Sequence, residues 1–237
     1  MRNIFRFFLL SLTTVVIVGC GQNKVITSCE DIIKNTYSSS SLNNFEKNKF
    51  KDLLLNRYPK FDSMFQEAAE ETNIEKNLLA AISFQESQWD PKAKSSMGVR
   101  GMMMVTLETA ALVGVEKRLN PEQNIKGGAR YFAMLLEKNK VGATDADKLS
   151  TALASYNLGP TNINNIAFSI NENVENVSWV EIKESLKTLK NSEINLMDND
   201  AYTRGQQAID YVDRVSEYYK LLSAHACVAP KDQLVFF

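Results

Sequence analysis

The sequence is poor in the residues that most often build metal and nucleophilic sites. Its 237 residues include one histidine, His225, and three cysteines, Cys20, Cys29 and Cys227. A metal centre needs several clustered ligands, and serine–histidine catalysis needs a histidine beside the nucleophile. We therefore predict no metal, no cofactor and no catalytic histidine.

A strong net charge is also missing. The 27 basic and 28 acidic residues leave a formal net charge of −1, which gives no sign of a nucleic-acid-binding surface. With 44% hydrophobic residues and no internal repeat, the chain has the composition of one globular domain with a sizeable core. Apolar residues recur at helical spacing without sustained strand alternation, so the predicted fold class is mostly α.

Residues 1–19 have the pattern of a bacterial lipoprotein signal peptide. Arg2 and Arg6 precede an apolar run at 7–18, which is shorter than a typical membrane span. The run ends at Cys20 in a sequence that resembles a lipoprotein box, which predicts cleavage before Cys20 and lipidation of its thiol. Because no aspartate follows Cys20, we expect an anchor in the outer membrane, facing the periplasm. The alternative is an ordinary signal peptide followed by an incidental cysteine.

The segment 20–43 is polar and ends in a run of serines and asparagines, which predicts a flexible tether before a folded domain at 44–237. Cys29 and Cys227 lie on either side of the motif core of that domain, at about 60–223. An exported protein meets an oxidising compartment, where cysteines commonly pair. We hypothesise a Cys29–Cys227 disulfide; the alternative is two inert or intermolecular thiols.

Apolar spacing and capping residues place the expected helices. Asn120-Pro121 is a typical helix start, and Gly159-Pro160 a typical helix end. Ser178 and Glu181 have the spacing of a capping box. The expected helices lie at 45–58, 61–72, 75–88 and 106–113, from 120 onward, before 159, at 178–190 and at 204–222. Residues 91–104 are rich in small side chains and are expected to form an irregular loop.

Glu86 is the strongest candidate for a catalytic residue. It shares one helical stripe with Leu78, Leu79, Ile82 and Trp89, at spacings of three and four residues. A carboxylate on an apolar stripe is costly unless it is paired or protonated. A carboxyl group that stays protonated near neutral pH can act as a general acid. The alternative is a structural glutamate that neighbouring hydroxyls satisfy.

Three blocks of sequence carry a further signal. The first runs from Glu86 through Ser95 to Ala110, the second is 152–159, and the third begins at 202. In order and spacing, these blocks resemble the catalytic motifs of the soluble-lytic-transglycosylase family. The resemblance covers roughly residues 60–223. It implies a lysozyme-like α domain with a small hairpin beside the 96–104 loop.

The resemblance also implies cleavage of peptidoglycan glycan strands by a single carboxyl group. Glu86 would protonate the oxygen that links N-acetylmuramic acid to N-acetylglucosamine, while the substrate's own acetamido group stabilises the positive charge. Glu86 would then take the proton of the C6 hydroxyl, which closes a 1,6-anhydro ring without consuming water. Most glycosidases use two carboxylates. The nearest other acid is Asp90, which precedes Pro91 and is expected in a turn.

Supporting roles follow from motif position. Ser95 and Tyr156 match family residues close to the catalytic glutamate, although a loop cap and a core tyrosine are their alternatives. Asn157 would bind sugar or hold the loop. Gly101 would permit a turn in that loop.

The third block and the methionines at 102–104 complete the predicted site. Met103 and Met104, with Met102, form either a flexible apolar wall of the glycan groove or ordinary core. Met104 stands where most family members have glutamine, a variant that resembles a membrane-bound subgroup. Arg204 and Tyr211 match the third block, and a structural salt bridge is an equally good account of Arg204.

The sequence leaves three functions open. The first is a lipid-anchored lytic transglycosylase. The second is a lysozyme-type hydrolase of the same fold, which needs a second carboxylate across the cleft. The third is a non-catalytic wall-binding lipoprotein. The predicted partners are peptidoglycan glycan strands, a membrane through the N-terminal lipid, and an unidentified cell-wall or secretion machinery, without nucleic acid.

Overall fold

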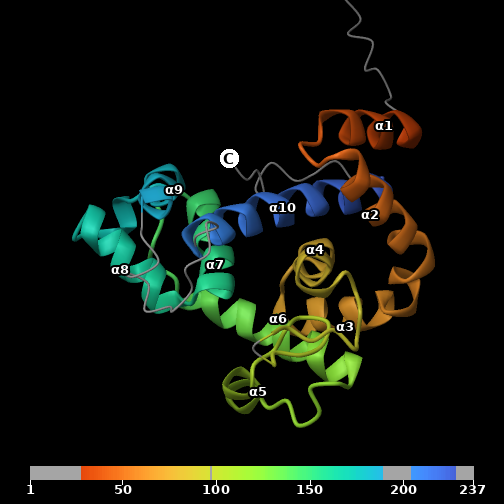
Figure 1. The fold of residues 1–237 in the computed structure, drawn as a ribbon, viewed down its shortest axis with the longest axis horizontal. Helices are drawn as coiled ribbons and strands as arrows, with labels where there is room; N and C mark the ends of the chain where they lie inside the picture. The colour runs from red at the N-terminus through yellow and green to blue at the C-terminus, as the bar shows by residue number, and fades with distance from the viewer. Residues whose placement is uncertain (1–27, 97, 189–203, 228–237) are drawn as a thin grey trace, which may run out of the picture.

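The computed structural model describes residues 28–96, 98–188 and 204–227, and the elements named within these ranges are all helices (Figure 1). They are α1 (Cys29–Ser39), α2 (Asn44–Asn56), η1 (Tyr58–Lys60), α3 (Asp62–Thr72), α4 (Lys76–Ser87), α5 (Leu107–Val113), α6 (Pro121–Lys138), α7 (Asp145–Leu158), α8 (Pro160–Ile170), η2 (Val174–Asn176), α9 (Trp179–Thr188) and α10 (Arg204–His225). The predicted mostly α fold is therefore confirmed. Cys20 and the predicted signal peptide lie outside the described residues. Across the described helices, none combines the length and the apolar character that crossing a membrane requires.

Local signals place most helix ends close to their predicted positions. Asn43 begins α2 with a capping box, in which its side chain accepts from the Glu46 N–H and the Glu46 carboxylate accepts from the Asn43 N–H. Asn120 caps α6 in front of Pro121. Gly114, with a φ of 73°, ends α5.

Within the segment predicted as a flexible tether, residues 29–39 instead form helix α1. Ser28 caps this helix by accepting a hydrogen bond from the Asp31 N–H at 3.1 Å. Further along α1, the Tyr37 hydroxyl lies 3.0 Å from Nε2 of His225, on α10. The serine-rich composition predicted flexibility, but capping and contact with α10 order the segment.

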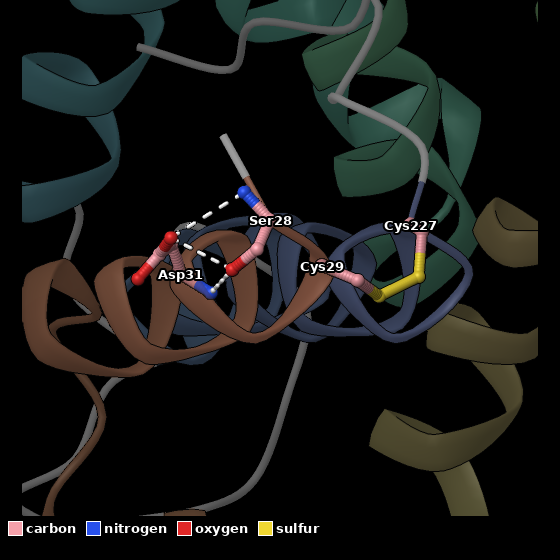
Figure 2. Close-up of a disulfide and its surroundings, with 4 residues drawn as sticks. All are labelled: Ser28, Cys29, Asp31 and Cys227. Atoms are coloured by element: carbon pink, nitrogen blue, oxygen red, sulfur yellow. Dashed lines mark hydrogen bonds between the residues drawn. A yellow bond between two sulfur atoms is a disulfide. The ribbon is translucent and has the colours of Figure 1, made fainter. Parts of the chain in front are cut away.

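A disulfide joins the start of α1 to the end of α10 (Figure 2). The Cα atoms of Cys29 and Cys227 lie 5.3 Å apart, and 198 positions separate the two residues in sequence. This is the pair that we hypothesised from the sequence. A cross-link over so long a loop removes conformational freedom from the unfolded chain and holds α1 against α10.

Helix α8 was not predicted. It follows α7 after Gly159 alone, and Pro160 occupies its first position. A proline there costs no hydrogen bond, because the first N–H groups of a helix have no partner within the helix. The Gly-Pro pair therefore separates two consecutive helices.

Helix α10 brings the C-terminal part of the chain against α4. In Figure 1 it crosses the molecule with α1 and α2 toward one end and α7 toward the other, and α4 lies beneath it. It packs chiefly on α4 and α7. Its buried side chains include Tyr211, Val215, Tyr218 and Tyr219. The last turn of α4, which contains Glu86, is thus covered by a helix far away in sequence.

The chain turns sharply just after Glu86. Gln88 and Trp89 adopt left-handed backbone, with φ values of 55° and 59°. The helical stripe that we extended to Trp89 therefore stops at Ser87, and that part of the prediction is wrong. Trp89 instead returns to the core, where it is fully buried and its Nε1 donates to the Ala80 carbonyl at 2.9 Å.

The loop after this turn forms less regular structure than predicted. Arg100 makes two isolated antiparallel bridges, one with Lys94 and one with Val105. The hairpin expected near 96–104 is reduced to these single pairs, and no named strand occurs among the described residues. The loop needs other contacts to hold its shape beside Glu86.

Candidate active site

The Glu86 carboxyl group has an unusually high proton affinity. Part of the side chain is exposed, but protein surrounds the carboxyl, and this burial raises its pKa from 4.5 to about 7. A hydrogen-bonding contact with Tyr211 opposes the rise. The negative end of the α4 dipole also disfavours a carboxylate in the last turn. Glu86 can therefore hold or release a proton near neutral pH, as general acid–base catalysis requires.

Two tyrosines from distant helices flank Glu86. Burial raises the pKa of Tyr156, on α7, and of Tyr211, on α10, and the charge of Glu86 raises both further. The Tyr156 hydroxyl donates to the Met103 carbonyl at 2.7 Å. The buried Tyr211 hydroxyl makes no hydrogen bond of ordinary geometry with the described residues. Its contact with the Glu86 carboxyl is therefore a loose one, which leaves the hydroxyl able to tighten onto a carboxylate.

No second carboxyl group among the described residues acts on the pKa of Glu86. Burial and Tyr211 are the causes of its shift. A carboxylate about 5 Å away, as in retaining glycosidases, would raise the pKa further by like-charge repulsion. Asp90 accepts a hydrogen bond from the Lys92 N–H at 2.9 Å, which is the turn role predicted for it.

Serine hydroxyls of α4 hold the loop against the helix that contains Glu86. Ser83 and Ser87 both donate to the Met102 carbonyl, at 3.0 and 2.8 Å. Ser83 is fully buried, and sequence reasoning missed it. A serine on the apolar side of a helix, one turn before a catalytic candidate, is the signal that could have found it.

Asn124 is a second residue that sequence reasoning missed. It is fully buried in α6; its Oδ1 accepts from the Met103 N–H at 2.7 Å, and its Nδ2 donates to the Arg100 and Arg118 carbonyls at 3.1 and 2.8 Å. Gly101 has a φ of 87°, and a Cβ at that position would overlap the Asn124 amide. Gly101 thus has the predicted turn-forming role, and the close approach of Asn124 adds a second reason for glycine.

A cleft of about 460 Å³ adjoins this group of residues. Met104, Glu108, Tyr131, Tyr156 and Asn157 are among the residues that line it. The ring centroids of Tyr131 and Tyr156 lie 5.5 Å apart. Because the charge of Glu86 acts on Tyr156 as well, Tyr156 connects the cleft to Glu86. An elongated ligand in the cleft would meet aromatic rings, an amide and a thioether.

Of the loop residues predicted for the site, some line the cleft and others are buried in the core or cap the loop. Met102 and Met103 are fully buried, so the core alternative holds for them, and Met103 as a wall of the groove is wrong. Met104 lines the cleft, with a φ of 46° that turns the chain there. The Ser95 hydroxyl accepts from the Val99 N–H at 3.1 Å, the loop-cap alternative, and no hydrogen bond to Glu86 occurs in the part of the chain described.

Arg204 lies at the start of the helix that also contains Tyr211. It begins α10, two turns before Tyr211, and its Nη1 donates to the Gln207 side chain at 3.3 Å. The next residue, Gly205, packs so closely on the Leu186 carbonyl that a side chain would not fit. Arg204 therefore lies next to the place where the start of α10 packs against α9.

Comparison with known proteins now adds to this geometry. The family model described as the transglycosylase SLT domain matches residues 63–176. These residues belong to the transglycosylase SLT family. The SLT match includes Glu86, Ser95 and Tyr156 but ends before α10, so Tyr211 approaches the SLT core from outside the matched residues.

Named relatives of the chain agree with this match. It is 40% identical over 167 residues to membrane-bound lytic murein transglycosylase F 1 of Alkalilimnicola ehrlichii, covering 70% of this chain and 34% of the relative. It is 41% identical over 165 residues to membrane-bound lytic murein transglycosylase F of Aeromonas hydrophila, covering 69% and 33%. The chain thus spans about a third of the length of these curated relatives.

A solved structure shares the fold of the chain. The 70 kDa soluble lytic transglycosylase of Escherichia coli matches 85% of this chain and 30% of its own, with a TM-score of 0.55 and 21% identity. The lysozyme-like helical fold predicted from the sequence is therefore confirmed.

Proposed function

We propose that this protein is a lytic transglycosylase, which cleaves the β-1,4 bond between N-acetylmuramic acid and N-acetylglucosamine in peptidoglycan and leaves a 1,6-anhydro end. The observation that carries the proposal is one carboxyl group, Glu86, with a pKa of about 7 beside a cleft. The names of the relatives, membrane-bound lytic murein transglycosylase F, support the same reaction.

In the first step, protonated Glu86 gives its proton to the glycosidic oxygen, and the bond from that oxygen to C1 of N-acetylmuramic acid breaks. The N-acetylglucosamine side leaves as an alcohol. The acetamido oxygen of the substrate stabilises the positive charge at C1, so no carboxylate of the protein is needed there. Burial supports this step because it keeps Glu86 protonated near neutral pH.

In the second step, the Glu86 carboxylate accepts the proton of the C6 hydroxyl of N-acetylmuramic acid, and the C6 oxygen bonds to C1. Glu86 returns to its protonated form, and no water is consumed. The Tyr211 hydroxyl can donate to the carboxylate between the two steps, which agrees with its lowering of the Glu86 pKa. Tyr156 and Asn157 would orient the sugar in the cleft.

The test is a digest of purified peptidoglycan with the full chain in detergent, beside the Glu86→Gln variant, with the products identified by mass spectrometry. We expect muropeptides that end in 1,6-anhydro-N-acetylmuramic acid from the native protein and none from the variant. Both proteins must show the same circular dichroism spectrum, so that a loss of products is not a loss of fold.

The same digest separates the two alternatives. Reducing-end products, heavier by one water, would show a lysozyme-type hydrolase and would contradict the single-carboxyl mechanism. Binding to peptidoglycan without any product from the native protein would favour a wall-binding lipoprotein.

We also propose that Cys20 anchors the protein by a lipid to the outer membrane, facing the periplasm, after removal of residues 1–19. The relatives' printed names include the words membrane-bound, which supports a cell-envelope location. Metabolic labelling with a palmitate analogue should mark the native protein and not the Cys20→Ser variant. Label on the variant would contradict the anchor.

A further inference from the structure

A second groove lies at the same end of α4. It has a volume of about 340 Å³, and its walls come from α2, α4 and α10. Among its lining residues are Asn43, Phe45, Lys49, Gln85, Gln88 and Tyr218. We call it the α2 groove. Helix α2 precedes residues 63–176 and α10 follows them, so two of the three walls of this groove lie outside the SLT match.

The α2 groove and the cleft lie on opposite flanks of Glu86. Gln85 and Gln88 line the α2 groove, one position before Glu86 and two positions after it. Since an α-helix turns by about 100° per residue, Phe84, also in this groove, lies roughly 160° around α4 from Glu86. Glu86 faces Tyr156, which lines the cleft. A polymer that occupied both grooves would cross the end of α4 where the proton donor lies.

The lining of the α2 groove suits a saccharide. The Phe45 side chain is 73% exposed, although large aromatic side chains are usually covered. The Lys49 ammonium lies 5.8 Å from the centroid of its ring. The amides of Asn43, Gln85 and Gln88 supply both donors and acceptors. A pyranose ring offers an apolar face to an aromatic ring and hydroxyl or acetamido groups to amides.

The charges of the groove favour an uncharged ligand over an acidic one. Arg214 lines the groove, but its Nε is 3.1 Å from Oε1 of Glu46, another lining residue, so this pair is neutral overall. Lys49 remains as a cation, and it lies over the Phe45 ring. A groove that binds the carboxylates of a peptidoglycan stem peptide is expected to contain more cationic side chains than Lys49 alone.

We propose that the α2 groove binds a saccharide segment of the glycan strand, on the opposite flank of Glu86 from the cleft. The identity of this polymer rests on the proposed function. The binding itself is separate from the reaction, because the groove does not include the Glu86 carboxyl. The consequence is that a strand is held on both sides of the bond that Glu86 protonates.

The test measures binding without cleavage. Isothermal titration calorimetry with the full Glu86→Gln chain in detergent compares it with the same chain that also has Phe45→Ala. The matched control is Leu55→Ala, which removes another exposed side chain of α2, 63% exposed and outside the groove lining. The probes are peptide-free glycan strands and the free stem tetrapeptide.

We expect Phe45→Ala to weaken binding of the peptide-free glycan roughly fivefold to tenfold, as for loss of one aromatic contact. Leu55→Ala should leave the glycan affinity unchanged. The affinity for the tetrapeptide should be the same in all of the variants. Equal glycan affinity with and without Phe45→Ala would overturn the inference. An equal loss in Leu55→Ala, or a loss of tetrapeptide affinity alone, would also overturn it.

A digest of whole peptidoglycan with the native protein, compared with these affinities, separates this inference from the proposed function. If the native protein forms anhydro ends but Phe45→Ala does not change the glycan affinity, only the inference about the α2 groove fails. If glycan affinity depends on Phe45 but the native protein forms no anhydro ends, the proposed reaction fails while the saccharide site stands.

Discussion

Two glutamates of the domain, Glu86 on α4 and Glu217 on α10, have pKa values that are shifted in opposite directions. Burial raises the pKa of Glu86 to about 7, and only the loose contact with Tyr211 opposes it. Burial also acts to raise the pKa of Glu217, but hydrogen bonds from Ser40, Lys220 and the Ser41 N–H outweigh it, and the pKa is lowered. The Ser41 N–H and the Lys220 ammonium lie 3.0 and 2.9 Å from the Glu217 carboxylate.

The difference between these two residues lies in their hydrogen-bond donors, since burial acts to raise both pKa values. Burial alone does not make a proton donor, because a buried carboxylate that accepts several hydrogen bonds stays ionised. The pKa of Glu86 is raised because protein buries its carboxyl and only Tyr211 acts to lower the pKa. Glu217 instead accepts a hydrogen bond from the Ser41 N–H, which holds α10 against the segment between α1 and α2.

The largest expected effect is on activity. Glu86→Gln should lower the rate of release of anhydro muropeptides by about 10²- to 10⁴-fold, the usual contribution of a general acid–base group. Glu217→Gln should keep the native chemistry, because its carboxyl is already ionised and hydrogen-bonded. Initial rates at one pH and temperature check this. Comparable losses in the two variants would remove the distinction between the glutamates.

The next effect is on the stability of the Glu217 end of α10, where the disulfide lies. Reduction, or Cys29→Ser with Cys227→Ser, should lower the free energy of unfolding by about 2–4 kcal/mol. The pH dependence of cleavage should not change, because Cys227 lies beyond the end of α10, four turns past Tyr211. Urea unfolding followed by circular dichroism checks the stability. A shifted pH profile after reduction would mean that the two ends of α10 are coupled.

Substitution of the two glutamates should then change stability with opposite signs. The folded-state pKa of Glu86 is above 4.5, so the folded chain loses stability as pH rises from about 4.5 to about 7. At pH 8, Glu86→Gln should therefore be more stable than the native protein by roughly 1–3 kcal/mol, and this gain should vanish below pH 4.

Glu217 follows the reverse dependence. Its folded-state pKa is below 4.5, so its contribution is present above that pH and is lost as pH falls through the folded-state value. Glu217→Gln should be less stable than the native protein at pH 8, by about 1–3 kcal/mol. Urea unfolding at several pH values measures both variants. A stability change of the same sign in both variants at pH 8 would show that hydrogen-bond donors do not decide the direction of the two pKa shifts.

The smallest effect concerns Tyr211. Tyr211→Phe removes the donor that lowers the pKa of Glu86, so the alkaline limb of the pH–rate profile should move to higher pH. The maximal rate should fall about threefold to tenfold, the cost of one hydrogen bond to a carboxylate. The matched control is Tyr219→Phe, because the Tyr219 hydroxyl donates to Glu75, at 2.9 Å, instead of contacting Glu86. If the alkaline limb of Tyr211→Phe lay at the same pH as that of the native protein, the contact between Tyr211 and Glu86 would be contradicted.

Local patterns accounted for much of the fold and for the central residue of the site. Helix periodicity, with Asn120, Gly114 and the Asn43 capping box, acts within a few residues of sequence, so it could be predicted without packing. Glu86 stood out because a charged residue on an apolar stripe is costly wherever that helix packs.

Predictions failed where distant segments meet. Asn124 holds the loop through hydrogen bonds to three separate backbone positions, and nothing in its own sequence neighbourhood indicates this. Met103 and Met104 are neighbours, yet one is core and the other lines the cleft, because the backbone turns at Met104. Helix α1 is ordered by α10, with which it shares the disulfide.

The residues along the chain were sufficient to indicate a helical domain with one carboxyl group of unusual placement, because periodicity and desolvation cost are local properties. Whether that carboxyl holds a proton depended on α10, which places Tyr211 beside Glu86 and leaves Glu217 among donors from another part of the chain. A pKa reflects the solvent and the hydrogen-bond donors around a group, and here most of those come from residues remote in sequence.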